Sequence, residues 1–441
     1  MAHNENTRVK IPAILHLCRL GYSYISLSDS VWDLNTNIFT DLFCKSIQHI
    51  NPQLDLDAAK RVFNDVSLAL SNEDDLGQAF YQMLTSSNDI KLIDFSSPEN
   101  FRNNNSFHVV TELPCRNGEE EFRPDITLLI NGMPLAFIEV KKPNNREGIL
   151  AERDRINARF KNKKFRKFIN VSQILVYSNN MEYDLESIVP IQGAFYSTIS
   201  YQKADFNCFR EEHTFNLDEI LKPEDDDIEN YVLKDTNLSP IKYSPEFLIN
   251  KEVSTPTNRI LTSLFSMDRL AMLLKYSFAY VRTETGLEKH IMRYPQLFAT
   301  KAIEATFDKG IKKGIIWHTQ GSGKTALAFY NVHYLTDYFH GKGVVPKFYF
   351  IVDRIDLMTQ AKLEFSSRGL VVHTVNSKDE LVKDFRGRGA IHNLTGKREI
   401  TVVNIQKFKD DTDFLHANYY DINTQRSEEH TSELQSHHDL V

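Results

Sequence analysis

A glycine-rich run between an apolar stretch and a helix-like stretch constrains the fold of this 441-residue chain more than any other feature. The run spans 321–325 (G-S-G-K-T) and follows the apolar stretch 315–317. Glycines permit the tight curl that points successive backbone N–H groups inward, and the start of the next helix adds positive potential. The combination predicts a parallel α/β sheet with a phosphate-binding loop at the end of a strand.

The same run predicts ATP and its Mg²⁺ as ligands. Lys324 would reach the β- and γ-phosphates, and the Thr325 hydroxyl would bind the metal. The loop residues expected to hold the nucleotide are Gln320, Gly321, Ser322, Gly323, Lys324 and Thr325. His318 stands where the usual pattern has its first glycine. Upstream, Gln296 could recognise adenine by bidentate hydrogen bonding, although by its chemistry alone it is more often a surface or capping glutamine.

A second candidate site is a carboxylate pair on the two strands that flank Asn131-Gly132, a strong hairpin signal. Glu139 and Lys141 are two residues apart on one strand and therefore share a face. A three-residue loop or a bulge would set Asp125 opposite Glu139, whereas a strict two-residue turn would put them on opposite faces. Converging carboxylates suit Mg²⁺ or Mn²⁺, with Lys141 orienting the nucleophile in phosphodiester cleavage. The alternative is a salt-bridged surface without a catalytic role.

Basic residues gather directly after this pair, although the whole chain has 52 Lys and Arg against 59 Asp and Glu. Because the net charge is −7, any nucleic-acid surface must be local. The tract 141–167 is net positive and predicts contacts with a phosphate backbone. Its candidate DNA-binding residues are Lys142, Arg153, Arg155, Arg159, Lys163 and Lys164. A solvated basic helix face would have the same pattern.

Composition and spacing limit the remaining possibilities. Hydrophobic residues make up 41% and charged residues 25%, a globular balance that excludes a wholly disordered chain. The four cysteines lie far apart, which argues against a disulfide framework or a zinc cluster and predicts a cytoplasmic protein. No apolar stretch is long enough to cross a membrane, and no targeting segment is recognisable.

Together these motifs resemble the restriction (R) subunit of type I restriction-modification enzymes. The segments 124–125 and 138–142 are similar to the PD-(D/E)xK nuclease core of that family, and 317–325, His318 included, is similar to its motif I. Further similarities occur in the family's order at 255–258, 293–296, 350–354 and 403–408. The Q-x-x-x-Y pattern often found in the helix after the nuclease strand is absent from 149–160. Gln173 and Tyr177 have its spacing on a predicted strand, and no role is assigned to them.

The resemblance implies a two-part α/β architecture. It places a PD-(D/E)xK endonuclease domain at 1–215, an acidic linker at 216–254, a helical connector with the adenine element at 255–313, and a P-loop RecA-like domain at 314–425. The last would be the first motor domain of a superfamily 2 translocase. It lacks the acidic box that should follow residue 408, so we expect weak ATP binding without useful hydrolysis. The tail 426–441 resembles a translated sequencing-adapter oligonucleotide.

The implied activity is an ATP-dependent endonuclease that translocates double-stranded DNA and cuts it, with Mg²⁺, away from the recognition site. The implied partners are specificity and methyltransferase subunits, with no membrane. In the nuclease, Asp125 and Glu139 would hold the metal and Lys141 would assist the nucleophile. Two alternatives are a superfamily 2 helicase whose carboxylates are structural, and a non-catalytic fragment that binds DNA or a partner.

Overall fold

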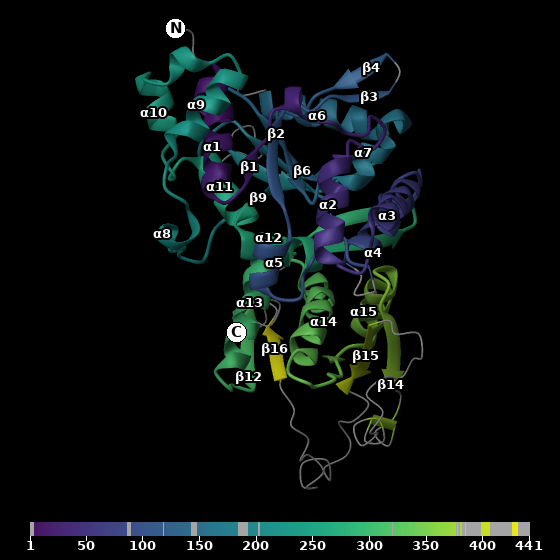
Figure 1. Cartoon of the computed structure of the whole chain (residues 1–441). Coiled ribbons are helices and arrows are strands. Elements are labelled where there is room, and N and C mark those ends of the chain that lie inside the picture. Colours follow the sequence, from purple (N-terminus) through teal and green to yellow (C-terminus); the bar gives the residue numbers. More distant parts are fainter. Residues whose placement is uncertain are drawn as a thin grey trace. The chain divides into compact units, whose positions relative to one another are not determined.

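A seven-stranded mixed sheet forms the centre of the first of two units in the computed structural model (Figure 1). The structure describes residues 4–85, 90–117, 119–142, 148–183, 193–201, 203–319, 321–375, 377, 380–381, 384, 398–405 and 426–430. The first unit comprises Met1–Phe278 with Leu287–Ile291, and the second comprises Ala279–Gly286 with Met292–Val441.

The sheet of the first unit has the strand order β1-β2-β5-β6-β7-β8-β9. Its strands are β1 (Ser23–Tyr24), β2 (Phe107–Thr111), β5 (Ile126–Ile130), β6 (Met133–Val140), β7 (Ile174–Ser178), β8 (Ala194–Ser197) and β9 (Asn207–Cys208). The pairs β1–β2 and β6–β7 are parallel, and the other neighbours are antiparallel. A separate hairpin joins β3 (Cys115–Asn117) to β4 (Glu120–Phe122).

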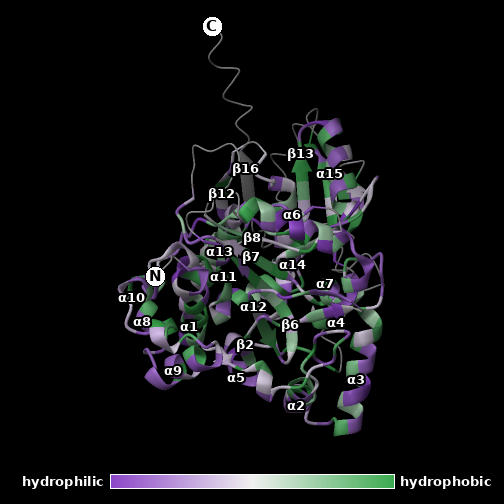
Figure 2. Cartoon of the chain, turned by 90° about the horizontal axis from the view of Figure 1, so that it is seen from above, coloured by the Kyte–Doolittle hydropathy of each residue, from purple (hydrophilic) through white to green (hydrophobic). Residues whose placement is uncertain are grey.

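The three central strands lie wholly inside the unit. Every residue of β5, β6 and β7 is buried, as expected for strands covered on both faces, and this explains their nearly continuous apolar sequences. Aromatic rings fill one side of the sheet, where Phe122, Phe137, Phe168 and Phe195 belong to one cluster. The strands of this sheet include much of the hydrophobic colour in Figure 2. Any polar side chain on them is therefore held in a dry environment.

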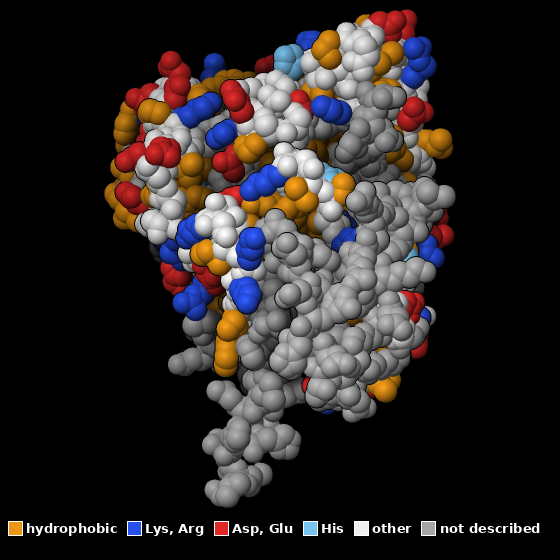
Figure 3. All heavy atoms as spheres, turned by 90° about the horizontal axis from the view of Figure 1, so that it is seen from below, with side chains coloured by type: hydrophobic (Ala, Val, Ile, Leu, Met, Phe, Trp, Pro, Cys, Tyr) orange, Lys and Arg blue, Asp and Glu red, His pale blue; other side chains and the backbone are white. Residues whose placement is uncertain are grey.

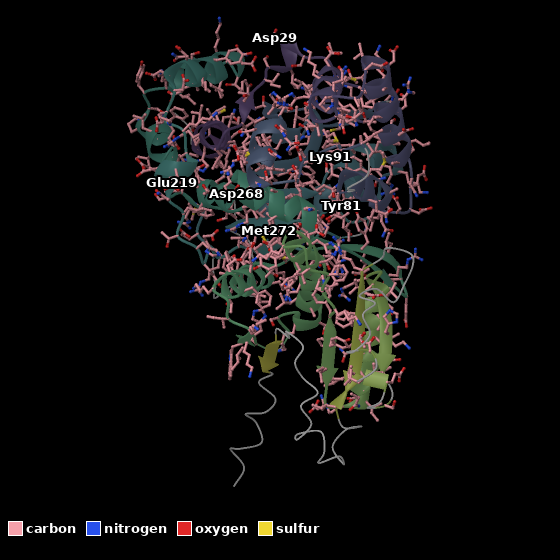
Figure 4. All side chains as sticks on the ribbon, turned by 60° about the horizontal axis from the view of Figure 1, so that its bottom comes forward. Asp29, Tyr81, Lys91, Glu219, Asp268 and Met272 are labelled. Atoms are coloured by element: carbon pink, nitrogen blue, oxygen red, sulfur yellow. The ribbon has the colours of Figure 1, made fainter. Side chains whose placement is uncertain are left out.

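Helices surround this sheet. They are α1 (Ile11–Arg19), α2 (Thr40–Ile50), α3 (Leu56–Ala69), α4 (Gln78–Thr85), α5 (Pro98–Asn104), α6 (Gly148–Lys161), α7 (Arg166–Val171), α8 (Leu217–Ile220), α9 (Asp226–Asp235), α10 (Pro245–Asn250), α11 (Pro256–Phe265) and α12 (Met267–Tyr276). Shorter turns are η1 (Asn6–Lys10), η2 (Leu27–Asp29), η3 (Lys163–Phe165) and η4 (Ser239–Ile241). Tyr81 of α4, labelled in Figure 4, donates from its hydroxyl to Lys275 O at 3.1 Å and so ties α4 to α12.

The segment 216–254, for which we expected an acidic linker, forms α8, α9, η4 and α10. Asp225 caps α9 by accepting from the backbone of Asp227 and Ile228. Val232, Leu233 and Phe247 are buried, so apolar anchors hold these helices to the unit. Most of the acidic residues that suggested a linker lie on the outward side of folded helices. A count of charged residues does not distinguish such helices from an unfolded segment.

Parallel strands dominate the second unit, in agreement with the predicted α/β class. β13 (Tyr349–Val352), β15 (Glu399–Asn404) and β14 (Val371–Val375) form one parallel sheet in that order, and β12 (Lys313–Trp317) pairs in parallel with β16 (Arg426–His430). The helices are α13 (Tyr294–Asp308), α14 (Lys324–His340) and α15 (Ile355–Ser367). A hairpin of β10 (Phe278–Thr283) and β11 (Gly286–Ile291) lies where the chain passes between the units.

Two further expectations concern the C-terminal tail and membrane-spanning helices. Of the tail 426–441, only the backbone at 426–430 is described, as β16, and the remainder lies outside the described residues. Across the described part of the chain, no helix combines the length and the apolar character needed to cross a membrane.

Candidate functional site

The β5–β6 hairpin contains the irregularity on which the carboxylate site depends. Asn131 and Gly132 have φ values of 51° and 76°, typical of a tight two-residue turn, and Ile130 pairs with Met133 beside it. The register then shifts between Leu128 and Leu129, so that Ile126 pairs with Ile138. Continued by one residue, this register sets Asp125 opposite Glu139. The bulge therefore meets the condition that a plain two-residue turn would have broken.

Asp125, Glu139 and Lys141 lie together at the end of this hairpin. The backbone N–H of Val140 donates to Asp125 Oδ2 at 2.9 Å, which fixes the orientation of that carboxylate. Lys141 Nζ lies 3.9 Å from the same oxygen and 3.5 Å from Glu152 Oε2. The structure thus brings together all three residues that we expected to be catalytic, and places an ammonium beside two carboxylates.

Glu139 is a buried carboxyl group that the nearby Lys141 compensates only in part. Its side chain is 4% exposed, and among the described residues its Oε1 has no hydrogen-bond partner. Burial raises the pKa of Glu139 well above its usual range, and the nearby Asp125 and Glu152 raise it further. A cation that approaches this carboxyl group would favour its ionised form.

This environment fits a divalent cation. Two adjacent carboxylates, one with a buried oxygen left unpaired, supply the hard ligands that Mg²⁺ and Mn²⁺ prefer. Within the part of the chain that the structure describes, no group of three or more His, Cys, Asp or Glu side chains is placed to hold a metal. Mg²⁺ sites commonly complete their shell with water and substrate phosphate.

Sequence reasoning missed Glu152, which lies on α6 and is 3% exposed. It accepts from Arg155 at 3.0 Å and from Arg159 at 3.3 Å, and it pairs with Lys141. Its position among many bases hid it, although its i, i+3 relation to Arg155 was visible in the sequence. Lys10, whose Nζ is 4.0 Å from Asp125 Oδ1, was also missed, because nothing local links η1 to the hairpin.

The expected DNA-binding residues are less free than the sequence suggested. Arg153 pairs with Asp154 at 3.2 Å, Lys163 with Glu73 at 2.7 Å, and Lys164 with Glu120 at 2.7 Å. Arg155 and Arg159 pair with Glu152, and Lys142 is exposed. The exposed pairs of Lys163 and Lys164 are weak, so these two lysines remain compatible with the predicted role, whereas Arg155 and Arg159 are held by the buried Glu152.

The phosphate-binding loop has the backbone that its glycines predict. Gly321 and Gly323 have φ values of 75° and 85°, in the left-handed region that favours glycine. Lys324 and Thr325 are the first residues of α14, and Lys324 Nζ donates to the carbonyl oxygens of His318 and Thr319 at 3.4 Å each. Ser322 lies between the two glycines, and Gln320 falls outside the described residues.

Gln296 lies beside this loop and is engaged by the protein itself. Its Nε2 donates to Gly323 O at 3.0 Å, and its Oε1 accepts from the backbone N–H of Arg293 at 2.9 Å. The Arg293 guanidinium donates to Gly321 O at 3.1 Å. The amide groups that a bidentate adenine contact needs are therefore used here to hold the loop, and the adenine role stays a prediction.

Comparisons with known proteins agree with this two-part organisation. Residues 2–185 match the family described as "Type I restriction enzyme R protein N terminus", and residues 289–441 match "Type III restriction enzyme, res subunit". The first match contains the carboxylate site, and the second contains the phosphate-binding loop. The first part is thus similar to restriction-enzyme R proteins, and the second part is similar to a helicase-like restriction subunit.

Several curated relatives are type I endonuclease subunits. The putative MjaVIIP and MjaIXP subunits of Methanocaldococcus jannaschii are 27% and 25% identical over 72% and 82% of this chain. The HindI subunit of Haemophilus influenzae is 26% identical over 79% of it. The matched parts make up 26%, 34% and 31% of those relatives, so this chain spans about a quarter to a third of their length. The family matches and the relatives together support an R subunit of a type I restriction enzyme.

Proposed function

We propose that the first unit is a Mg²⁺-dependent DNA endonuclease with a PD-(D/E)xK site. The observation that carries the proposal is the convergence of Asp125, Glu139 and Lys141 beside a buried carboxyl oxygen that has no hydrogen-bond partner in the described part of the chain. Asp125 and Glu139 would hold the cation, which when bound would supply charge stabilisation at the scissile phosphate and a more acidic water.

The roles of the protein groups follow from their positions. The Val140 N–H keeps Asp125 oriented, and the dry surroundings of Glu139 strengthen its attraction for a cation. Lys141, placed between Asp125 and Glu152, would orient the attacking water and stabilise the developing negative charge. Lys142 and the arginines of α6 would bind the DNA backbone next to this site.

We propose further that the second unit binds ATP with Mg²⁺ and belongs to a motor that translocates double-stranded DNA. The left-handed glycines and the position of Lys324 at the start of α14 support phosphate binding there. The relatives are named as subunits of type I restriction enzymes, which supports assembly with other subunits. The partners in this proposal are specificity and methyltransferase subunits, and cleavage occurs away from the recognition site.

The test is plasmid cleavage by the chain reconstituted with its specificity and methyltransferase subunits. Asp125→Asn keeps an acceptor for Val140 N–H but removes a charge, and should lower cleavage by about 100-fold or more. Asp154→Asn is the matched control, because Asp154 is exposed and its ion pair is with the neighbouring Arg153. Cleavage by Asp125→Asn at the wild-type rate would remove the nuclease assignment and favour a helicase with structural carboxylates.

A further inference from the structure

The helices α8 to α10 belong to a segment that neither family match covers. The matches end at residue 185 and resume at residue 289. Between them, 216–254 contains ten acidic and four basic residues, an excess of six negative charges in a chain whose net charge is −7. The negative excess on this short segment is therefore almost as large as the net charge of the whole chain.

The segment is held firmly in one conformation. Val232, Leu233 and Phe247 are buried on its inner side. Lys251 donates to Glu224 at 2.7 Å and to Glu229 at 2.6 Å, which links α10 to α9 and to the turn before it. Lys242, just after η4, donates to Asp226 at 3.1 Å. A surface fixed in this way loses little conformational entropy when something binds to it.

The outer side of the same helices is unusually apolar. Among the described residues of the first unit, eleven large hydrophobic side chains are exposed, and six of them fall within residues 217–249. These are Leu217, Ile228, Tyr231, Tyr243, Leu248 and Ile249. Tyr243 is 81% exposed and Ile249 is 67% exposed. Exposed apolar side chains gathered in one region are characteristic of protein interaction sites, and tyrosine is enriched in such sites.

Acidic groups accompany these apolar side chains. In Figure 3 acidic and hydrophobic side chains lie next to one another along the left edge, the side on which Figure 1 draws α8, α9 and α10. Figure 4 labels Glu219 of α8 in this region. Asp227 and Glu252 are exposed, and their carboxylates form no ion pair among the described residues. This combination repels nucleic acid and favours a surface of the opposite charge.

We propose that the outer face of α9, η4 and α10 docks a protein partner whose contact surface is apolar and basic. The inference rests on the proposed function, under which the chain assembles with specificity and methyltransferase subunits. It assigns the contact to this acidic–apolar face of the first unit rather than to the basic tract after Lys141. Tyr243 and Ile249 would enter apolar depressions of the partner, and Asp227 and Glu252 would meet basic side chains at its rim.

The experiment measures binding of the chain to the purified methyltransferase–specificity complex by biolayer interferometry. The double variant Tyr243→Asp, Ile249→Asp should raise Kd about tenfold or more, since buried aromatic and aliphatic anchors dominate interface energies. The matched control is Val31→Asp, Leu68→Asp, two residues 71% and 74% exposed elsewhere in the unit, and it should bind as the wild type does. Unchanged thermal unfolding would show that both variants are folded.

Charge-reversal variants distinguish specific docking on this face from nonspecific apolar contact. Asp227→Lys with Glu252→Lys should weaken binding severalfold at low salt, and the difference should disappear at about 0.5 M salt because screening removes it. Wild-type affinity for the anchor variant, or self-association of the chain through this face, would overturn the inference. If the wild type does not bind the complex at all, the partner assignment under the proposed function fails together with the inference.

Discussion

Glu139 shows how one buried carboxyl group can link stability to function. Burial and two neighbouring acids raise its pKa, so without a cation the folded protein keeps a proton on it. Its isolation costs stability, since among the described residues its Oε1 has no partner. Strained electrostatics of this kind are characteristic of sites that bind a charged ligand rather than of structural ion pairs.

The first prediction follows from the sign of this shift. An unfolded glutamate is ionised above its ordinary pKa of 4.5, whereas folded Glu139 stays protonated above that value. The free energy of unfolding should therefore fall as the pH rises from 4.5 to the raised pKa. The glutamine of Glu139→Gln does not titrate, so this variant should lack that pH dependence. Urea unfolding at pH 5 and pH 7 should show that the variant is more stable, relative to wild type, at pH 7 than at pH 5.

Metal binding should displace the proton that folded Glu139 holds. Mn²⁺ requires the ionised carboxylate, so its affinity for the wild type should increase with pH and proton release should appear as a buffer-dependent heat in calorimetry. Glu139→Gln should lose most of the affinity. A Mn²⁺ affinity that does not change between pH 5.5 and pH 7.5 would contradict the assignment of Glu139 as a ligand.

At the scale of elements, the β5–β6 hairpin positions the site through its turn and its bulge. The turn packs tightly against α2, because Phe39 N donates to Gly132 O at 2.9 Å. A Cβ added to Gly132 would lie 2.7 Å from Phe39 O and 2.7 Å from Phe43 N, both backbone atoms. The left-handed φ of 76° also disfavours any other residue there.

Gly132→Ala should therefore destabilise the first unit by about 2 to 4 kcal/mol, since it adds backbone overlap to the unfavourable φ. Gly310→Ala is the matched control, because Gly310 has a similar φ of 73° but open space around the added Cβ, and should cost about 1 kcal/mol. Urea unfolding of both variants measures the difference. Equal losses in the free energy of unfolding would mean that α2 shifts to accommodate the added methyl group.

At the scale of the whole molecule, the two candidate sites lie in separate compact units. Asp125 and Glu139 belong to the first unit, and Lys324 belongs to the second. Each unit has its own sheet and its own buried residues. Among the described residues assigned to the two sites, no side chain belongs to both.

We therefore expect the two sites to respond independently to mutation. Lys324→Ala should abolish binding of a fluorescent ATP analogue while leaving Mn²⁺ affinity within about twofold, and Asp125→Asn should do the reverse. Lys342→Ala, which removes an exposed lysine of the second unit that pairs with Asp308, is the control. A tenfold loss of Mn²⁺ affinity in Lys324→Ala would show that the units are coupled.

Much of the fold was accessible from sequence, and so was the proximity of Asp125, Glu139 and Lys141, whose catalytic roles stay a prediction. The hairpin expected at Asn131-Gly132 joins β5 to β6, and the helix expected at 149–160 is α6. Glu152 and Lys10 were not accessible, because they reach the site from other elements. The hydrogen bonds of Gln296 to the loop were also missed, because Gly323 lies 27 residues further along the chain.

The sequence by itself determined the features that depend on neighbouring residues. These are the Asn131-Gly132 turn, the left-handed glycines of the phosphate-binding loop, and the shared face of Glu139 and Lys141. Each follows from local sterics or from the two-residue period of a strand. The tertiary structure decided the bulge between Leu128 and Leu129, the burial that raises the pKa of Glu139, and the folding of 216–254. Those features depend on packing between segments far apart in the chain, whose energies no local pattern contains.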